Sequence, residues 1–287
     1  MRHFWEIDKL NVKSMNRKNW PDEKIFFRLL NNKSDKTYWD NIAVLRSRPN
    51  DEVFKKSLEL TKSKKPNERI IGIDVLAQLG VTPRPFYKQT IKRFFELLSN
   101  ESNAKVLGSL LYAIGHNNDS LSKSQITQLS SFKNHKDNWV KEGLVFAIIG
   151  LDNQRAIDAS IILSNDKIAA IRNWATFGMG SLIEQDNKDI RNALWNRVKD
   201  KHQETKLEAI VGLAKRKDLR VIEIIKKELA NGEYGTLIFE AIEELNDKQF
   251  LPLLQQNLKT AKSDKGINPE WVKDLENCMK NLKRTGK

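Results

Sequence analysis

Five aspartates recur along the chain at intervals of about 30 residues, and carboxylates in a regular pattern could either bind a metal or cap helices. They are Asp119, Asp152, Asp186, Asp218 and Asp247. A metal site needs ligands that converge on one point, whereas a repeat of this length spreads them along a stack. An Asp at a turn accepts hydrogen bonds from the free N–H groups of the next helix and complements its dipole. We therefore expect each of the five to cap a helix.

The other residue types that carry chemistry are scattered. The histidines are His3, His116, His135 and His202. None has a second histidine or a cysteine at the short spacing typical of metal ligands on a helix. The single cysteine, Cys278, excludes an internal disulfide and every zinc site built from several cysteines. The sequence thus predicts no catalytic residue, no metal and no cofactor.

A basic residue opens each of five similar segments, and small or apolar residues follow it three and six places later. The basic residues are Arg69, Lys105, Lys141, Arg172 and Lys206. Their spacing of about 31 to 36 residues, combined with helical patterning, is the signature of stacked helix pairs. In this pattern Gly72, Gly108, Ala175 and Ala209 are packing positions, and Gly178 and Gly180 fall inside a helix.

We therefore expect an all-α fold, a right-handed α-α superhelix (a helical-repeat solenoid) of about six helix pairs with a capping helix at each end. Residues 1–35 would form a basic arm and a capping helix, residues 36–262 the solenoid, and residues 263–287 a C-terminal capping helix. The whole would be one structural domain.

The charge and composition limit the classes of partner. The chain of 287 residues has a formal net charge of +13 and 30% charged residues. No apolar run approaches the roughly 20 residues of a membrane helix, and no segment resembles a signal peptide. We expect a cytoplasmic protein without a membrane partner. The excess positive charge either attracts nucleic acid or only solvates the outer helix faces.

Large apolar residues recur on the helix side that faces away from the expected buried stripe. At 100° per residue, positions two and five places after each basic residue fall on that side. In the central repeats these positions hold Leu107, Leu110, Phe146, Trp174 and Phe177. An exposed aromatic row on a concave face would form a binding groove, because such rings commonly anchor interfaces. The alternative is that neighbouring helices cover these side chains.

The flanks of this predicted groove are acidic. Asp74 lies on one side, and Glu208, Glu240 and Glu243 lie on the other. Acidic flanks favour a basic protein partner and disfavour nucleic acid on this face.

Two segments resemble the HEAT-repeat family, whose second helices commonly open with an Arg followed by Ala and Leu at helical spacing. They are Ala170-Ile-Arg-Asn-Trp-Ala175 and Thr205-Lys-Leu-Glu-Ala209. The longer stretches Arg172–Gly180 and Glu208–Asp218 are similar to a bacterial group of HEAT proteins labelled lyase-like. One enterobacterial member of that group is linked to immunity against an Rhs-type toxin. The resemblance implies a repeat scaffold and an immunity role; a shared scaffold does not transfer lyase chemistry.

Our hypothesis is a non-catalytic scaffold that grips a partner protein, such as a toxin domain, on its concave face. Its predicted partner-binding residues are Asp74, Phe146, Trp174, Phe177, Glu208, Glu240 and Glu243. The alternative is a nucleic-acid-binding protein or a HEAT-like alkylpurine DNA glycosylase, which also places aromatics and a carboxylate on a concave face. A third possibility is self-assembly through the terminal repeats, although we expect a monomer.

Overall fold

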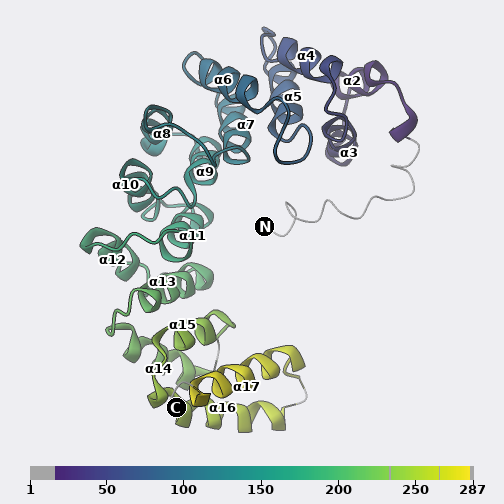
Figure 1. The fold of residues 1–287 in the computed structure, drawn as a ribbon. Helices are drawn as coiled ribbons and strands as arrows, with labels where there is room; N and C mark the ends of the chain where they lie inside the picture. The colour runs from purple at the N-terminus through teal and green to yellow at the C-terminus, as the bar shows by residue number, and fades with distance from the viewer. Residues whose placement is uncertain (1–16, 233, 265, 285–287) are drawn as a thin grey trace. The chain divides into compact units, whose positions relative to one another are not determined.

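Helix follows helix along the whole described part of the chain. The computed structural model describes residues 17–232, 234–264 and 266–284. Residues 1–16 of the predicted N-terminal arm, with His3, lie outside this range. The described residues form sixteen α-helices, α2 to α17, and no strand (Figure 1). The prediction of an all-α fold is confirmed.

Two parts of the chain each form a compact unit. Unit 1 is Met1–Ala147 and unit 2 is Ile148–Lys287. We describe each unit separately. The predicted boundaries after residues 35 and 262, and the single structural domain, stay predictions.

In unit 1, alternate helices pack side by side as a series of stacked helices, and the remaining helices flank them (Figure 1). The stacked helices are α3 (Asp35–Arg46), α5 (Pro66–Ala77), α7 (Ala104–Gly115) and α9 (Asn138–Ile148), whose last residue begins unit 2. The flanking helices are α2 (Asp22–Leu30), α4 (Asp51–Leu60), α6 (Tyr87–Leu98) and α8 (Lys123–Ser130). The short 3-10 turns are η2 (Arg17–Asn19) and η3 (Ser131–Asn134).

Unit 2 repeats this arrangement. Its stacked helices are α11 (Ala169–Phe177), α13 (Gln203–Lys215), α15 (Leu237–Leu245) and α17 (Pro269–Arg284). Its flanking helices are α10 (Gln154–Leu163), α12 (Lys188–Trp195), α14 (Val221–Asn231) and α16 (Leu251–Ser263). A π-helical segment, η4 (Gly178–Leu182), continues α11, and a 3-10 turn, η5 (Lys248–Phe250), precedes α16. The helices that carry the repeated basic residues in their first turn are therefore all stacked helices.

The difference between flanking and stacked helices follows from their sequences. The flanking helix α6 buries Phe94 and Leu98 on one side and exposes Lys88 and Lys92 on the other. The stacked helix α7 is apolar on most of its circumference and has neighbours on several sides, including α5 and α6. A helix that is apolar all round requires burial on more than one face.

This burial decides between the two interpretations of Leu107 and Leu110. They are 3% and 0% exposed, so neighbouring helices cover them and they form no part of an open groove. The pattern within one helix cannot show how far its neighbours wrap around it, so their coverage was not visible in the sequence.

Small residues let the stacked helices approach their neighbours closely, as the repeat pattern predicted. A Cβ on Gly72 would lie 2.5 Å from the backbone oxygen of Ser57. In unit 2, a Cβ on Gly212 would lie 2.5 Å from the Cα of Gly180. Both distances are shorter than van der Waals contact, so only glycine fits these positions without displacing backbone.

Two of the five repeated basic residues, Arg69 and Arg172, join one repeat to the next. Arg69 Nε and Nη2 donate to both carboxylate oxygens of Glu101, at 2.7 and 3.1 Å. Arg172 binds Asp200 in the same way, at 2.8 and 2.9 Å. Two-bond guanidinium–carboxylate pairs fix geometry as well as charge. Arg69 and Arg172 are thus structural connections rather than parts of a binding face.

The five aspartates only partly match the capping prediction. Asp218 and Asp247 accept a backbone N–H two residues later, at 3.2 and 2.9 Å. The prediction is wrong for Asp119, Asp152 and Asp186, because side chains closer to the helix start cap the next helix. These caps are Ser122 on α8, Asn153 on α10 and Asn187 on α12.

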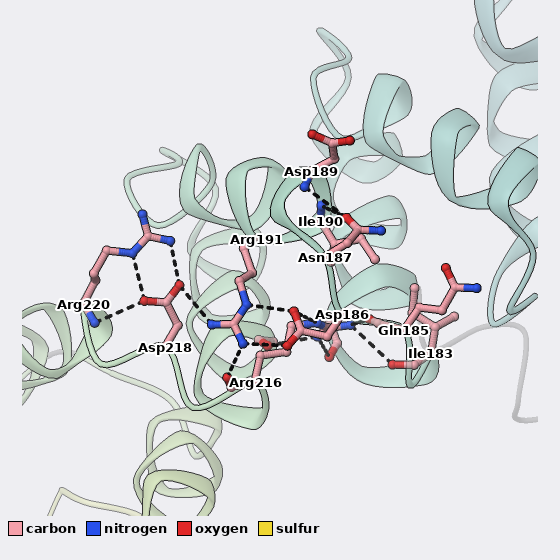
Figure 2. Close-up of polar contacts among 12 residues, drawn as sticks. Ile183, Gln185, Asp186, Asn187, Asp189, Ile190, Arg191, Arg216, Asp218 and Arg220 are labelled. Atoms are coloured by element: carbon pink, nitrogen blue, oxygen red, sulfur yellow. Dashed lines mark hydrogen bonds and ion pairs between the residues drawn. The ribbon is translucent and has the colours of Figure 1, made fainter.

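Displacement from the cap leaves Asp186 free to bind cations. Arg191 donates to both its oxygens, at 2.8 and 2.5 Å, and lies 3.6 Å from Asp218 (Figure 2). Arg220 binds the same Asp218 at 2.8 and 2.6 Å. Hydrogen bonds from Arg191 and Arg220 hold the pKa of Asp186 and Asp218 below the ordinary range of a carboxyl. Two consecutive repeat aspartates therefore share one arginine.

Arg216 fills the space beneath the π-helical segment. It is 9% exposed and donates to the carbonyl oxygens of Met179, Gly180 and Gln185 at 2.8, 3.1 and 2.8 Å. A π-helical segment at a helix end leaves carbonyl groups without their usual helical partners. The guanidinium satisfies these groups in the interior of unit 2, and Figure 2 shows it beside Asp186.

Candidate functional site

The most distinctive surface of unit 2 combines aromatic and acidic side chains on its stacked helices. We call it the acidic face and define it by Trp174, Phe177, Ser181, Glu208, Glu240 and Glu243. The members come from α11, η4, α13 and α15, which are successive neighbours. The structure therefore brings together five of the seven residues predicted to bind a partner.

The aromatic part comes from α11. The rings of Trp174 and Phe177 meet edge to face with centroids 5.8 Å apart, and both side chains are half-buried. Their spacing of three residues puts them on one side of the helix, and Ser181 follows one turn further along. Each ring leaves part of its surface uncovered, as an interface anchor requires.

Glu208 adds a carboxylate whose negative charge has few stabilising partners. Ser181 Oγ donates to Glu208 Oε2 at 3.4 Å, which is a long hydrogen bond. Burial, together with the negative charge of Glu240, raises the pKa of Glu208 to about 7. No ion pair with Glu208 is present within the described residues. At neutral pH this carboxylate is held close to the point where it takes up a proton.

The acidic face continues into a pocket between α15 and α17. The pocket has a volume of about 370 Å³, and Glu240, Glu243 and Asp274 line it. Lys215 binds Glu240 at 3.0 Å, and Asn281 donates to Glu243 at 2.9 Å. With Glu208, this part of unit 2 gathers four carboxyl groups, of which Glu240 forms an ion pair with Lys215, although the whole chain is strongly basic.

The two remaining predicted residues, Asp74 and Phe146, lie in unit 1. The Tyr38 hydroxyl donates to Asp74 Oδ2 at 2.6 Å. Burial raises the pKa of Asp74 to about 6 and also raises the pKa of Tyr38. Phe146 is half-buried and packs against Tyr112 and His116, with ring centroids 5.3 and 5.1 Å apart.

A polar network around Asp74 was missed in the sequence. Arg46 Nε donates to the backbone oxygen of Asp74 at 2.9 Å, and its Nη1 donates to Gln78 Oε1 at 2.7 Å. Gln78 Nε2 lies 2.9 Å from His116 Nδ1. Because Oε1 accepts from Arg46, Nε2 is the amide donor and His116 Nδ1 must accept. His116 is thus neutral here, and burial next to Arg46 and Arg84 lowers its pKa to about 4.

The spacing of this network carried a signal that could have revealed it. Tyr38 and Asp74 are 36 residues apart, and Gln78 and His116 are 38 apart. Both intervals are close to one repeat. Aligning consecutive repeats, rather than reading one repeat at a time, would have placed these polar residues opposite each other.

Two other kinds of feature, a metal site and a membrane-spanning helix, were sought among the described residues. No group of three or more His, Cys, Asp and Glu side chains among them is placed to hold a metal ion. In the same part of the chain, every helix is too short or too polar to cross a bilayer.

Comparisons with known proteins identify relatives. No family model matches the chain. Protein YibA of Escherichia coli K12 is 30% identical over 241 residues, which cover 81% of this chain and 83% of YibA. This chain belongs to the YibA family. YibA of E. coli O157:H7 matches with the same identity and coverage.

Solved structures extend the similarity to the fold. The crystal structure of E. coli YibA gives a TM-score of 0.77 at 25% identity, covering 96% of this chain and 98% of that chain. The crystal structure of an engineered protein gives a TM-score of 0.51 at 13% identity, covering 94% and 83%. The second similarity concerns the fold alone. The YibA-family chain therefore shares its helical architecture with E. coli YibA.

Proposed function

We propose that this chain is a non-catalytic HEAT-type repeat scaffold, a right-handed solenoid, that binds a basic partner protein in the cytoplasm through the acidic face. The partner's lysine or arginine side chains would meet Glu208, Glu240 and Glu243, and apolar groups would cover Trp174 and Phe177. The proposal retains five of the predicted binding residues. Asp74 is left out because its carboxylate accepts a hydrogen bond from Tyr38 inside unit 1.

The observation that carries the proposal is the half-buried Glu208 carboxylate, which has no ion pair among the described residues. A half-buried charge next to a second carboxylate destabilises the free protein. Such an arrangement is typical of a site where an incoming ligand supplies the missing charge. A cation seated between Glu208 and Glu240 would also lie near the Trp174 and Phe177 side, where ring faces attract positive charge.

A protein partner fits this surface better than a small substrate. The candidate residues extend over four successive elements of unit 2 rather than lining one enclosed cavity. Rows of anchors across adjacent repeats are typical of solenoids that hold extended partner surfaces. Acidic groups at such an interface act mainly on association rate and partner choice.

We place the partner among toxin domains. The support is the similarity of Arg172–Gly180 and Glu208–Asp218 to bacterial HEAT proteins, one of which is linked to immunity against an Rhs-type toxin. The test is co-expression with a toxin domain encoded beside this chain's gene. Growth should recover with the wild-type chain and with Leu219→Ala, and should not recover with the double variant Trp174→Ala/Phe177→Ala.

Binding itself is tested by comparing captured proteins between variants. Tagged wild-type chain, Trp174→Ala/Phe177→Ala, Glu208→Gln and Leu219→Ala are each used to recover proteins from the source cell. Leu219 is 67% exposed and outside the acidic face, so its variant is a matched control. A specific partner should be recovered by the wild type and the control and lost with the two acidic-face variants. A partner recovered equally by all four would contradict the proposal.

A further inference from the structure

A second surface, in unit 1, combines an apolar pocket with a guanidinium that forms no ion pair among the described residues. The pocket lies between α3, the end of α5 and the loop after α5, and its volume is about 440 Å³. Its lining residues are Trp39, Ala43, Arg46, Ser47, Pro49, Gln78, Gly80 and Val81. Trp39 and Val81 are 43% and 86% exposed, which is unusual for large apolar side chains in this chain.

The loop that forms one wall is held in place by backbone geometry. Gly80 has a φ of +80°, in the left-handed region that favours glycine. Its N–H donates to the carbonyl oxygen of Arg46 at 2.8 Å. This bond ties the wall carrying Val81 to the end of α3, so the pocket is preformed.

Arg46 is the only charged residue among those lining the pocket. Its two hydrogen bonds go to neutral oxygens, the Asp74 carbonyl and Gln78 Oε1. The Asp74 carboxylate accepts from Tyr38 and attracts Arg46 only from beyond ion-pair distance, and no ion pair joins Arg46 to any acid within the described chain. Arg69 and Arg172 behave differently, since each binds a carboxylate through two nitrogens.

This contrast indicates a missing anion. Burial lowers the pKa of Arg46 to about 10, so the group remains a cation at neutral pH despite its poor solvation. A partly buried cation whose hydrogen bonds all go to neutral oxygens is incompletely balanced by the more distant Asp74, and a carboxylate is the geometric match for its remaining guanidinium nitrogen.

The size of the pocket restricts how that carboxylate is presented. The guanidinium carbon lies 5.8 Å from the centroid of the Trp39 ring. An apolar group against Trp39 and a carboxylate on Arg46 must therefore sit a few ångströms apart. A C-terminal amino acid meets this condition, because one Cα carries both its side chain and its carboxylate.

We propose that this pocket binds the C-terminal residue of a partner polypeptide, with its apolar side chain between Trp39 and Val81 and its α-carboxylate on Arg46. The pocket volume lies in the range of small-ligand sites and suits one or two residues. Capture of a terminal carboxylate is a known mode of peptide recognition. This site is in the other unit from the acidic face and does not depend on the function proposed for it.

The test uses two probes that differ only in charge, N-acetyl-L-phenylalanine and N-acetyl-L-phenylalaninamide. Each is titrated into the full chain labelled with ¹⁵N in its tryptophan indoles, and Trp39→Phe assigns the Trp39 signal. We expect the acid to shift that signal saturably and to bind at least about tenfold more tightly than the amide, as expected for loss of a charged hydrogen bond.

A matched pair of variants locates the effect. Val81→Glu brings a carboxylate to the mouth of the pocket and should abolish binding of the acid. Leu219→Glu, which changes an exposed apolar residue in unit 2, should leave it unchanged. Binding that survives Val81→Glu, equal affinities for acid and amide, or no saturable shift with either probe would overturn the proposal. So would a Trp39 shift that depends on the concentration of the chain itself, because the occupant would then be a second copy.

Discussion

Glu208 of α13 and Glu240 of α15 repel each other across adjacent helices, and of the two only Glu240 forms an ion pair. Lys215 lies 3.0 Å from Glu240, whereas Glu208 receives one long hydrogen bond from Ser181. The charge of Glu240 is, after burial, the main cause that raises the pKa of Glu208 to about 7. This unequal pair links the stability of unit 2 to the surface proposed to bind a partner.

Replacing Glu208 by glutamine should make the free protein more stable at alkaline pH while it weakens partner binding. The folded-state pKa of about 7 exceeds the ordinary value of 4.5, so the folded chain loses stability as pH rises between these values. At pH 8 we expect Glu208→Gln to gain on the order of 1–2 kcal/mol, after allowance for solvent screening. Denaturant unfolding of both proteins at pH 8 measures this gain in the free energy of unfolding.

The control for this prediction is Glu243→Gln. Glu243 is exposed, and glutamine keeps the acceptor for Asn281. Its unfolding free energy should change by less than about 0.5 kcal/mol. If both variants behaved alike, Glu208 would carry no special electrostatic cost.

Acid should weaken unit 1 through His116. Its pKa is about 4 in the fold against 6.5 ordinarily, so the unfolded chain binds more protons between these values. Relative to His116→Asn, the wild type should lose on the order of 3 kcal/mol as pH falls from 6.5 to 4. Asp74 has a raised pKa and acts in the opposite sense, but it is present in both proteins and cancels.

The measurement for His116 is the difference in unfolding free energy between the two proteins at several pH values. An NMR titration of the ring provides a direct second reading. A midpoint near 6.5 would show that the bond from Gln78 does not hold the ring neutral.

Loss of Arg216 should destabilise unit 2 selectively. Arg216→Met leaves the carbonyl oxygens of Met179, Gly180 and Gln185 without their donor, and we expect a loss of about 3 kcal/mol. Arg220→Met removes a partly exposed guanidinium and should cost less than about 1 kcal/mol. Hydrogen exchange should show the increased opening in unit 2 and not in unit 1. Equal effects of the two substitutions would contradict the structural role of Arg216.

Duplex DNA should not compete for the acidic face. Fluorescence anisotropy with a labelled duplex, followed over a salt series, separates weak surface attraction from specific binding. We expect no saturable binding at physiological ionic strength that depends on Trp174. Tight, steeply salt-dependent binding that Trp174→Ala removes would favour the nucleic-acid alternative.

The repeat pattern was enough to predict the helices, because it records packing within each repeat. Gly72 and the basic residues at the repeat starts mark positions where neighbouring helices touch, so their spacing predicted which helices stack. The capping prediction failed at Asp119, Asp152 and Asp186 because helix starts shift by one to three residues, and Ser or Asn caps as well as Asp.

The candidate site was harder to predict, because exposure depends on contacts between repeats. Leu107 and Trp174 occupy the same position in their repeats, yet Leu107 is buried and Trp174 is half-buried. The sequence alone could not show which of the two side chains is exposed, because that depends on the neighbours of each helix. The Arg46 pocket also depends on a loop whose course follows from Gly80, which no helical periodicity describes.

The central claim is that the acidic face of unit 2 binds a partner protein with Trp174 as an anchor. Calorimetric titration of the purified partner against wild type, Trp174→Ala and Leu219→Ala tests it most directly. We expect Trp174→Ala to lose more than about 2 kcal/mol of binding free energy, roughly 30-fold in affinity, while Leu219→Ala stays within about 0.5 kcal/mol. An unchanged affinity for Trp174→Ala, with its helical spectrum and unfolding midpoint intact, would contradict the claim.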